Sequence, residues 1–165
     1  LRLDFGASYS RSRYKSGTYS QRFGAAGNCD GIVCSYVTVP GFSYPVLDIS
    51  GKQLERTPAF DAVAGLNYDT KFSNGWGFFA RADVTYQSKQ FADEANLAFV
   101  PSRTLVNASM DVGKFTVSLW TKNLLDKKYV TSALFLIGIN GAGSSSYVPL
   151  LGERRTGGLT ATYKF

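Results

Sequence analysis

Histidine is missing from the 165 residues of this chain, and cysteine (two) and methionine (one) are scarce. Without histidine the usual zinc and haem ligands and the Ser-His-Asp triad are excluded, so we expect no metal site, no cofactor and no enzyme. The alternative is a site completed by residues outside this chain. The longest run of apolar residues and glycine, Ala133–Ile139, is far below the roughly 18–20 residues of a transmembrane helix, which excludes a helical membrane protein.

Glycine (17) and aromatic residues (12 Phe, 10 Tyr, 2 Trp) are plentiful, and no helical periodicity accompanies them. This composition predicts an all-β fold. Apolar and polar residues alternate in six segments, close to the roughly 9–11 residues that a strand needs to cross a membrane. The predicted strands are residues 1–11, 57–71, 76–88, 104–112, 115–123 and 154–165.

The connections between these strands alternate between long and short. Residues 12–56, 89–103 and 124–153 form long loops, whereas Ser73-Asn74-Gly75 and Gly113-Lys114 are tight turns. Long extracellular loops and short periplasmic turns are typical of an antiparallel transmembrane β-barrel of the bacterial outer membrane. We therefore expect the long loops to be extracellular and the C-terminus to be periplasmic. The apolar positions then form two aromatic belts around an aliphatic band, which a soluble β-sandwich, the alternative, does not require.

Six strands are too few to close a bacterial barrel, which has at least eight. One alternative is a further hairpin in the first long loop, where Tyr36–Val39 and Val46–Ile49 could pair around Pro40 and Pro45. The other is an arc of a larger barrel. The chain begins at Leu1 without a secretory signal, so we expect its natural N-terminus upstream, which favours the arc.

One segment is specific to a family. Trp120–Tyr129 reads W-T-K-N-L-L-D-K-K-Y and resembles a stretch near the C-terminus of TonB-dependent outer-membrane receptors. Gly152–Arg155 resembles the Gly-x-x-Arg element that follows it, and Leu159–Phe165 the closing strand with its terminal aromatic residue. Gly51–Pro58 and Val106-Asn107 are weaker matches. The family positions matched are Asn123, Leu124, Asp126, Tyr129, Arg155, Tyr163 and Phe165.

The resemblance implies that this chain is a fragment, the last six strands of a 22-stranded, plugged barrel, without the plug and the TonB box. It implies energised uptake of a scarce ligand, commonly an iron–siderophore complex. The implied partners are lipid and lipopolysaccharide, the remaining barrel and plug, the TonB complex through the missing N-terminal part, and the barrel assembly machinery through the final strand. We expect no nucleic-acid partner. The alternative is a small stand-alone barrel with a structural or adhesive role.

Charged residues on the inward side of the predicted strands should line a hydrated lumen. We expect them to pair with one another and with the plug, the alternative being direct contact with ligand. They are Asp4, Asp61, Asp69, Arg81, Asp83, Asp111, Lys122 and Lys164.

Arginines just beyond the outer aromatic belt, on the lipid-facing side, are candidates for binding lipopolysaccharide phosphates, because guanidinium groups clamp phosphate well. The alternative is a solvated loop base. These arginines are Arg11, Arg13, Arg56 and Arg155.

Two loop features complete the predictions. Cys29 and Cys34 should form a small disulfide loop in an oxidising compartment, and metal binding there is disfavoured without histidine. The apolar run Ala133–Ile139 should pack under neighbouring loops or on the plug, the alternative being an exposed interaction patch.

Overall fold

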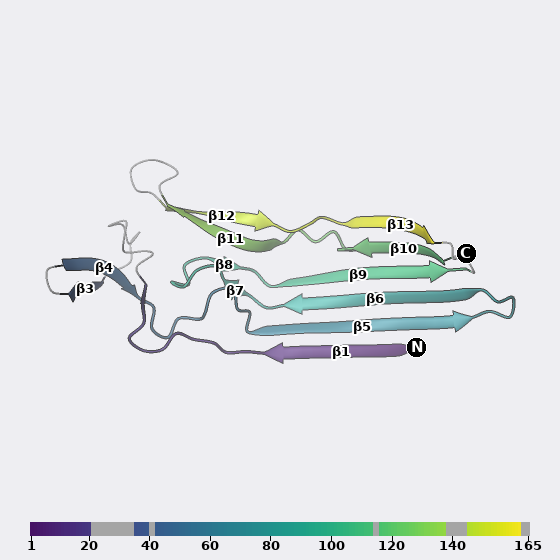
Figure 1. The fold of residues 1–165 in the computed structure, drawn as a ribbon, viewed down its shortest axis with the longest axis horizontal. Helices are drawn as coiled ribbons and strands as arrows, with labels where there is room; N and C mark the ends of the chain where they lie inside the picture. The colour runs from purple at the N-terminus through teal and green to yellow at the C-terminus, as the bar shows by residue number, and fades with distance from the viewer. Residues whose placement is uncertain (21–34, 40–41, 114–115, 138–144, 163–165) are drawn as a thin grey trace.

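The computed structural model describes residues 1–20, 35–39, 42–113, 116–137 and 145–162. All strand pairs in this part of the chain are antiparallel, which confirms the predicted all-β antiparallel fold. Six long strands lie side by side in one sheet (Figure 1). In order across the sheet they are β1 (Arg2–Tyr9), β5 (Phe60–Lys71), β6 (Gly77–Gln87), β9 (Arg103–Val112), β10 (Thr116–Lys122) and β13 (Thr156–Thr162).

The connections sort to opposite ends of this sheet. The long ones all leave from one end, and the short turns after β5 and β9 lie at the other (Figure 1). The β5–β6 turn closes through the Phe72 amide, which donates to the Trp76 carbonyl at 2.8 Å, and Gly75 takes a positive φ of 80°. A side chain is strained at such a φ, which is why glycine follows Asn74 in this turn.

The long connections contain strands of their own. A hairpin was considered in the first connection, but the strands in the second and third were not predicted. Three small sheets form: β2 and β3 with β4, β7 with β8, and β11 with β12. Their bounds are β2 (Tyr19–Ser20), β3 (Ser35–Val39), β4 (Phe42–Asp48), β7 (Gln90–Phe91), β8 (Phe99–Val100), β11 (Val130–Ile137) and β12 (Ser145–Leu151).

The hairpin expected in the first connection has a different register. Tyr36 pairs with Pro45 and Val39 with Phe42, so Phe42–Pro45 rather than Val46–Ile49 is the partner of Tyr36–Val39. The run from Ala133 was predicted as loop because it is continuously apolar instead of alternating. It forms most of β11, whose pairing with β12 supplies the backbone hydrogen bonds.

Cross-strand pairing sorts the side chains of the main sheet to its two sides, one mainly apolar and one mainly polar. One row across the six strands is Leu3, Leu66, Ala82, Ala108, Thr121 and Gly157. An adjacent row on the other side is Asp4, Gly65, Asp83 and Asn107. We call the side that carries Leu3 the apolar face and the side that carries Asp4 the polar face. The two faces follow from the period of two in the sequence, because neighbouring strands pair in register.

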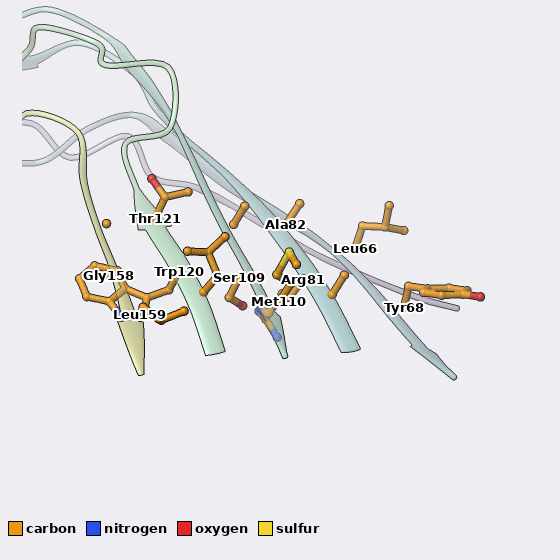
Figure 2. A pocket seen from close by; sticks show the side chains of 14 residues that line it. Leu66, Tyr68, Arg81, Ala82, Ser109, Met110, Trp120, Thr121, Gly158 and Leu159 are labelled. Atoms are coloured by element: carbon orange, nitrogen blue, oxygen red, sulfur yellow. The ribbon is translucent and has the colours of Figure 1, made fainter. Parts of the chain in front are cut away.

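The apolar face is uncovered by other parts of the described chain. Leu3, Phe5 and Leu159 keep 72%, 75% and 71% of their surface exposed. Alanines at its centre, between larger leucine and tyrosine side chains, leave a shallow hollow of about 740 Å³ (Figure 2). Contiguous apolar surface of this kind is not stable in water and must be covered in the native setting.

Burial of apolar side chains is confined to the long connections. Every buried apolar residue in the described part of the chain lies outside the six long strands: Val46, Leu47, Ile49, Ala92, Ala95, Val100 and Ala133. Within the described residues, no helix has the length and apolar character needed to cross a membrane.

Candidate functional site

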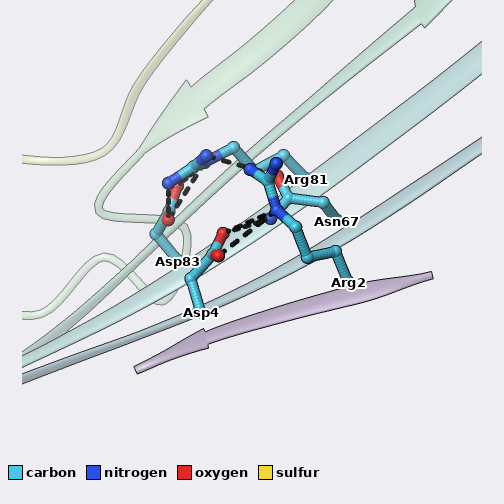
Figure 3. Close-up of polar contacts among 5 residues, drawn as sticks. All are labelled: Arg2, Asp4, Asn67, Arg81 and Asp83. Atoms are coloured by element: carbon cyan, nitrogen blue, oxygen red, sulfur yellow. Dashed lines mark hydrogen bonds and ion pairs between the residues drawn. The ribbon is translucent and has the colours of Figure 1, made fainter. Parts of the chain in front are cut away.

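A polar network joins three strands on the polar face (Figure 3). The Arg81 guanidinium donates to both carboxylate oxygens of Asp83, at 2.8 Å and 3.0 Å from Nε. Its Nη1 donates to Asn67 Oδ1 at 3.2 Å, and Asn67 Nδ2 donates to Asp4 at 2.8 Å. Arg2 completes the chain of contacts by donating to Asp4 at 3.3 Å. Opposite charges therefore pair within β1 and within β6, and Asn67 of β5, only 4% exposed, links the two ion pairs.

The other charged residues that were predicted to line the lumen also lie on the polar face, but they are not part of this network. Among the described residues, the side chains of Asp61, Asp69, Asp111 and Lys122 make no hydrogen bond or ion pair, although their backbones are paired in the sheet. Asp69 and Asp111 lie toward the short turns, both opposite Phe79. Asp61 lies near the long connections, opposite Ser8 and Gln87.

Asn123, the first residue of the family motif, organises the base of the third long connection. It is buried, with a positive φ of 48°, a conformation that asparagine tolerates better than most residues. Its Oδ1 accepts from the Lys127 amide at 2.9 Å. Its Nδ2 donates to the carbonyls of Lys127 at 2.9 Å and Glu153 at 3.0 Å. One side chain therefore ties together both ends of the connection.

Asp126 stabilises the base of the third connection through an ion pair and hydrogen bonds. Its carboxylate accepts from Nε and Nη2 of Arg154 and from the backbone amide of Arg155. These hydrogen bonds hold the pKa of Asp126 well below its ordinary value, the Arg154 side chain contributing most. The family motif contains Arg155, whereas the ion pair with Asp126 is made by its neighbour Arg154. Among the described residues, the Arg155 guanidinium makes one long hydrogen bond, 3.5 Å from Nη1 to the Leu124 carbonyl.

Tyr129 and Gly152 complete the motif by close packing. A Cβ on Gly152 would overlap the Tyr129 ring, so only glycine fits beneath this side chain. The Gly152 amide donates to the Tyr129 carbonyl at 2.9 Å. Arg103 stacks on the same ring, 5.4 Å from its centre, and donates from Nη1 to the Val130 carbonyl at 3.1 Å. Sequence reasoning missed Arg103, because its partners lie far from it along the chain.

The three long connections meet in one small core, which we call the loop core: Leu47, Ile49 and Ala95, with Tyr14 and Phe135 packed against them. The first connection supplies Tyr14, Leu47 and Ile49, the second Ala95 and the third Phe135. The Tyr14 hydroxyl donates to the Glu55 carboxylate. Burial raises the pKa of Tyr14, and the neighbouring Glu55 carboxylate adds to that shift.

A buried carboxylate fastens the loop core. Asp93 is 0% exposed and accepts from the amides of Leu97 at 3.1 Å and Ala98 at 2.9 Å. It also accepts from the Tyr147 hydroxyl at 3.1 Å, which joins the second connection to the third. The ring of Tyr147 packs 5.1 Å from that of Phe135. In the apolar run of β11, Ala133 is buried and Leu134 is exposed.

The remaining predicted residues have separate locations. Cys29, Cys34, Tyr163, Phe165 and Lys164 lie outside the described residues. The four arginines selected as phosphate ligands are all exposed. Arg13 donates from Nη1 to the Gly51 carbonyl at 2.6 Å. Arg11 and Arg13 follow β1 at one edge of the sheet, Arg56 precedes the neighbouring β5, and Arg155 precedes β13 at the opposite edge. In the part of the chain that the structure describes, no cluster of His, Cys, Asp and Glu could hold a metal ion.

Comparisons with known proteins are consistent with this architecture. No protein-family model matches the chain. The chain is 38% identical to a ferrioxamine receptor of Yersinia enterocolitica, over 51% of this chain and 15% of the receptor. Its fold resembles the ferric yersiniabactin uptake receptor FyuA of Yersinia pestis, with a TM-score of 0.56 and 19% identity. That match covers 67% of this chain and 17% of FyuA.

The chain thus spans less than a fifth of the length of either protein it matches. The sequence match and the fold match agree with the motif that begins at Asn123, the side chain that ties the third connection together. Both matches support the resemblance of this chain to a segment of the barrel of TonB-dependent outer-membrane receptors.

Proposed function

We propose that this segment belongs to a receptor that takes up an iron–siderophore complex across the outer membrane. The observation that carries the proposal is the 38% identity to a protein named as a ferrioxamine receptor. The structure supports it with a sheet whose one face is mainly apolar and whose other face carries paired charges. Such a sheet suits the wall of a water-filled lumen in lipid.

In this proposal the polar face lines the lumen and the apolar face contacts lipid. Aromatic pairs lie near both ends of the apolar face, Phe60 with Tyr86 at 6.0 Å and Tyr68 with Phe78 at 6.1 Å between ring centres. Aromatic belts at these two levels fit the two membrane interfaces. The long connections and the loop core would then be extracellular, and the short turns periplasmic.

The same proposal assigns partners. A plug would pack against the polar face, the TonB complex would supply energy through a part of the receptor outside this chain, and the assembly machinery would bind the final strand. Cys29 and Cys34 would be disulfide-bonded in the first loop. The segment would serve transport and not catalysis.

Uptake by the full-length receptor tests the proposed function. Cells that lack the receptor gene should lose accumulation of at least one ⁵⁵Fe-labelled siderophore from a panel of hydroxamate, catecholate and carboxylate types. Accumulation should return with the cloned gene and disappear when a protonophore collapses the energy supply. Equal accumulation of every tested complex with and without the gene would refute the proposal.

We also propose that Arg11, Arg13, Arg56 and Arg155 bind lipopolysaccharide phosphates. All four side chains are exposed, at the end of the sheet from which the long connections leave. Replacing all four by glutamine should increase the sensitivity of cells to bile salts, with the receptor still folded. Unchanged sensitivity would refute the phosphate contacts. Arg154→Gln is the matched control, because that arginine is engaged by Asp126.

A further inference from the structure

A second hollow in the sheet lies on the polar face, next to the long connections, with a volume of about 530 Å³. Most of its lining residues share the parity of Asp4 and so belong to the polar face. Two cross-strand rows make it: an upper row of Ser8, Asp61, Gln87 and Arg103, and a row beneath of Gly6, Val63, Thr85 and Leu105.

The lower row forms an apolar floor. Gly6 has no side chain, and Val63, Thr85 and Leu105 present methyl groups toward the polar side of the sheet. The row below it on the same face carries Asp4 and Asp83, the two acidic members of the charged network. The hollow is therefore an apolar floor between two polar rows, which is the usual composition of a small-molecule site.

The upper row places unlike charges at a defined separation. Asp61 and Arg103 are two strands apart, which puts their backbones at roughly 10 Å, with the Gln87 amide between them. The Asp61 carboxylate and the side-chain amide of Gln87 have no hydrogen-bond partner among the described residues. The guanidinium of Arg103 is half-buried and has one hydrogen bond to a described residue, the Val130 carbonyl. Arginine has five donors, so most of its capacity remains for an external acceptor.

Arg103 is also held in place. Arg103 contacts the Tyr129 ring and the Val130 carbonyl, which attaches it to the base of the third connection. Asn123 and Asp126 hold that base together by hydrogen bonds. A positioned cation costs little entropy when it binds an anionic ligand. Tyr129 of the family motif thus helps to position Arg103 at the edge of the hollow.

We propose that this hollow is a ligand subsite of the barrel wall, which binds a ferric siderophore by its periphery. Asp61 accepts from an amide or ammonium N–H of the chelator, Gln87 bridges, and Arg103, two strands away, donates to an anionic oxygen. The floor of Val63 and Leu105 covers an apolar spacer between the two groups. The subsite rests on the proposed uptake function and selects zwitterionic or amide-rich chelators over purely anionic ones.

Binding of ⁵⁵Fe-labelled siderophores to cells that produce the full-length receptor tests the subsite. Asp61→Asn should raise the dissociation constant of the bound complex about tenfold, since a charged hydrogen bond is weakened. Asp69→Asn is the matched control: it is on the same face and strand, near the short turns, and should change the constant less than about twofold. If wild-type receptor binds a complex and Asp61→Asn binds it equally well, the subsite is wrong while the uptake function stands.

A second measurement asks what occupies the hollow. In a Cys29→Ser, Cys34→Ser background, Gln87→Cys should react with a membrane-impermeant maleimide added to intact cells, and the bound ferric siderophore should slow the reaction at least fivefold. Failure to label would mean that the plug fills the hollow, which overturns the proposal. If wild-type receptor binds no complex of the panel, both the uptake function and the subsite fail.

Discussion

The six-stranded sheet and the loop core obey opposite rules of burial. In the described part of the sheet, large apolar side chains such as Phe5 and Leu159 are exposed, whereas the polar side chain of Asn67 is buried. In the loop core, Leu47 and Ile49 are buried and Asp93 is satisfied by three donors. One chain thus contains a part that suits lipid and a part that suits water.

The difference shows where the structural energy of each part resides. The sheet depends on its ladder of backbone hydrogen bonds and on a lipid environment for its apolar face, because no described part of the chain covers that face. The loop core depends on ordinary apolar burial and on two polar fasteners, Asp93 and Asn123. A change that harms one part should therefore spare the other.

A charge on the apolar face should have the largest effect. Val84→Lys places an ammonium group near the middle of the face and should cost about 2–4 kcal/mol in the membrane. Thr85→Lys, the next residue, points to the polar face and should cost little. The yield of heat-modifiable receptor in outer membranes measures both. Equal yields for the two variants would contradict the assignment of the faces.

Removing the buried carboxylate should disrupt the loop core alone. Asp93→Ala leaves the amides of Leu97 and Ala98 without an acceptor, at a cost of about 3 kcal/mol. External protease should then cleave the long connections at least tenfold faster, while heat modifiability stays as in the wild type. Glu153→Gln, an exposed site, is the control. If the long connections of Asp93→Ala resist protease as well as those of the wild type, apolar packing alone is enough to hold the loop core together.

Adding one methyl group at the base of the third connection should have a smaller effect. Gly152→Ala forces the Tyr129 ring away from its place and should cost about 2 kcal/mol. Gly77→Ala is the matched control, since a Cβ at that position would meet no atom within 4 Å. Protease cleavage of the third connection compares them. A wild-type cleavage rate in Gly152→Ala would mean that Tyr129 moves freely.

The ion pair of Asp126 should respond to pH with the smallest effect. Its folded-state pKa lies below the ordinary value of 3.8, so the stabilisation is complete above that value and falls as the pH drops toward the folded-state pKa. Protease resistance of the loop base should therefore be constant from about pH 5 to 8 and decrease below about pH 4. Asp126→Asn should remove this acid dependence. An acid dependence that persists in Asp126→Asn would assign it to another carboxyl group.

Prediction from the sequence worked best where the pattern is local. Each long strand has a side-chain period of two, and a tight turn such as Ser73-Asn74-Gly75 has its own composition, so the all-β class and the two faces could be predicted. The bounds of the strands differ from those expected by at most three residues at the described ends. The motif around Asn123 is a contiguous stretch of sequence and could be recognised directly, and the comparisons agree with the family that it indicated.

The rest depended on partners far apart along the chain. The choice of Arg154 over Arg155 for Asp126 depends on how β13 enters the sheet, and the β11–β12 hairpin lacks the alternation that marks a strand. The loop core joins Tyr14, Ala95 and Phe135, which no spacing rule connects. Burial of Asp93 could not be inferred from its neighbours.

By itself the sequence determined which side chains alternate, and therefore that the chain builds a sheet with one apolar and one polar face. Backbone pleating enforces this period of two whatever surrounds the strand. Only the tertiary structure decided which rows those side chains form, because register between strands sets the neighbours of each residue. It therefore decided that Asp61, Gln87 and Arg103 share one row above an apolar floor.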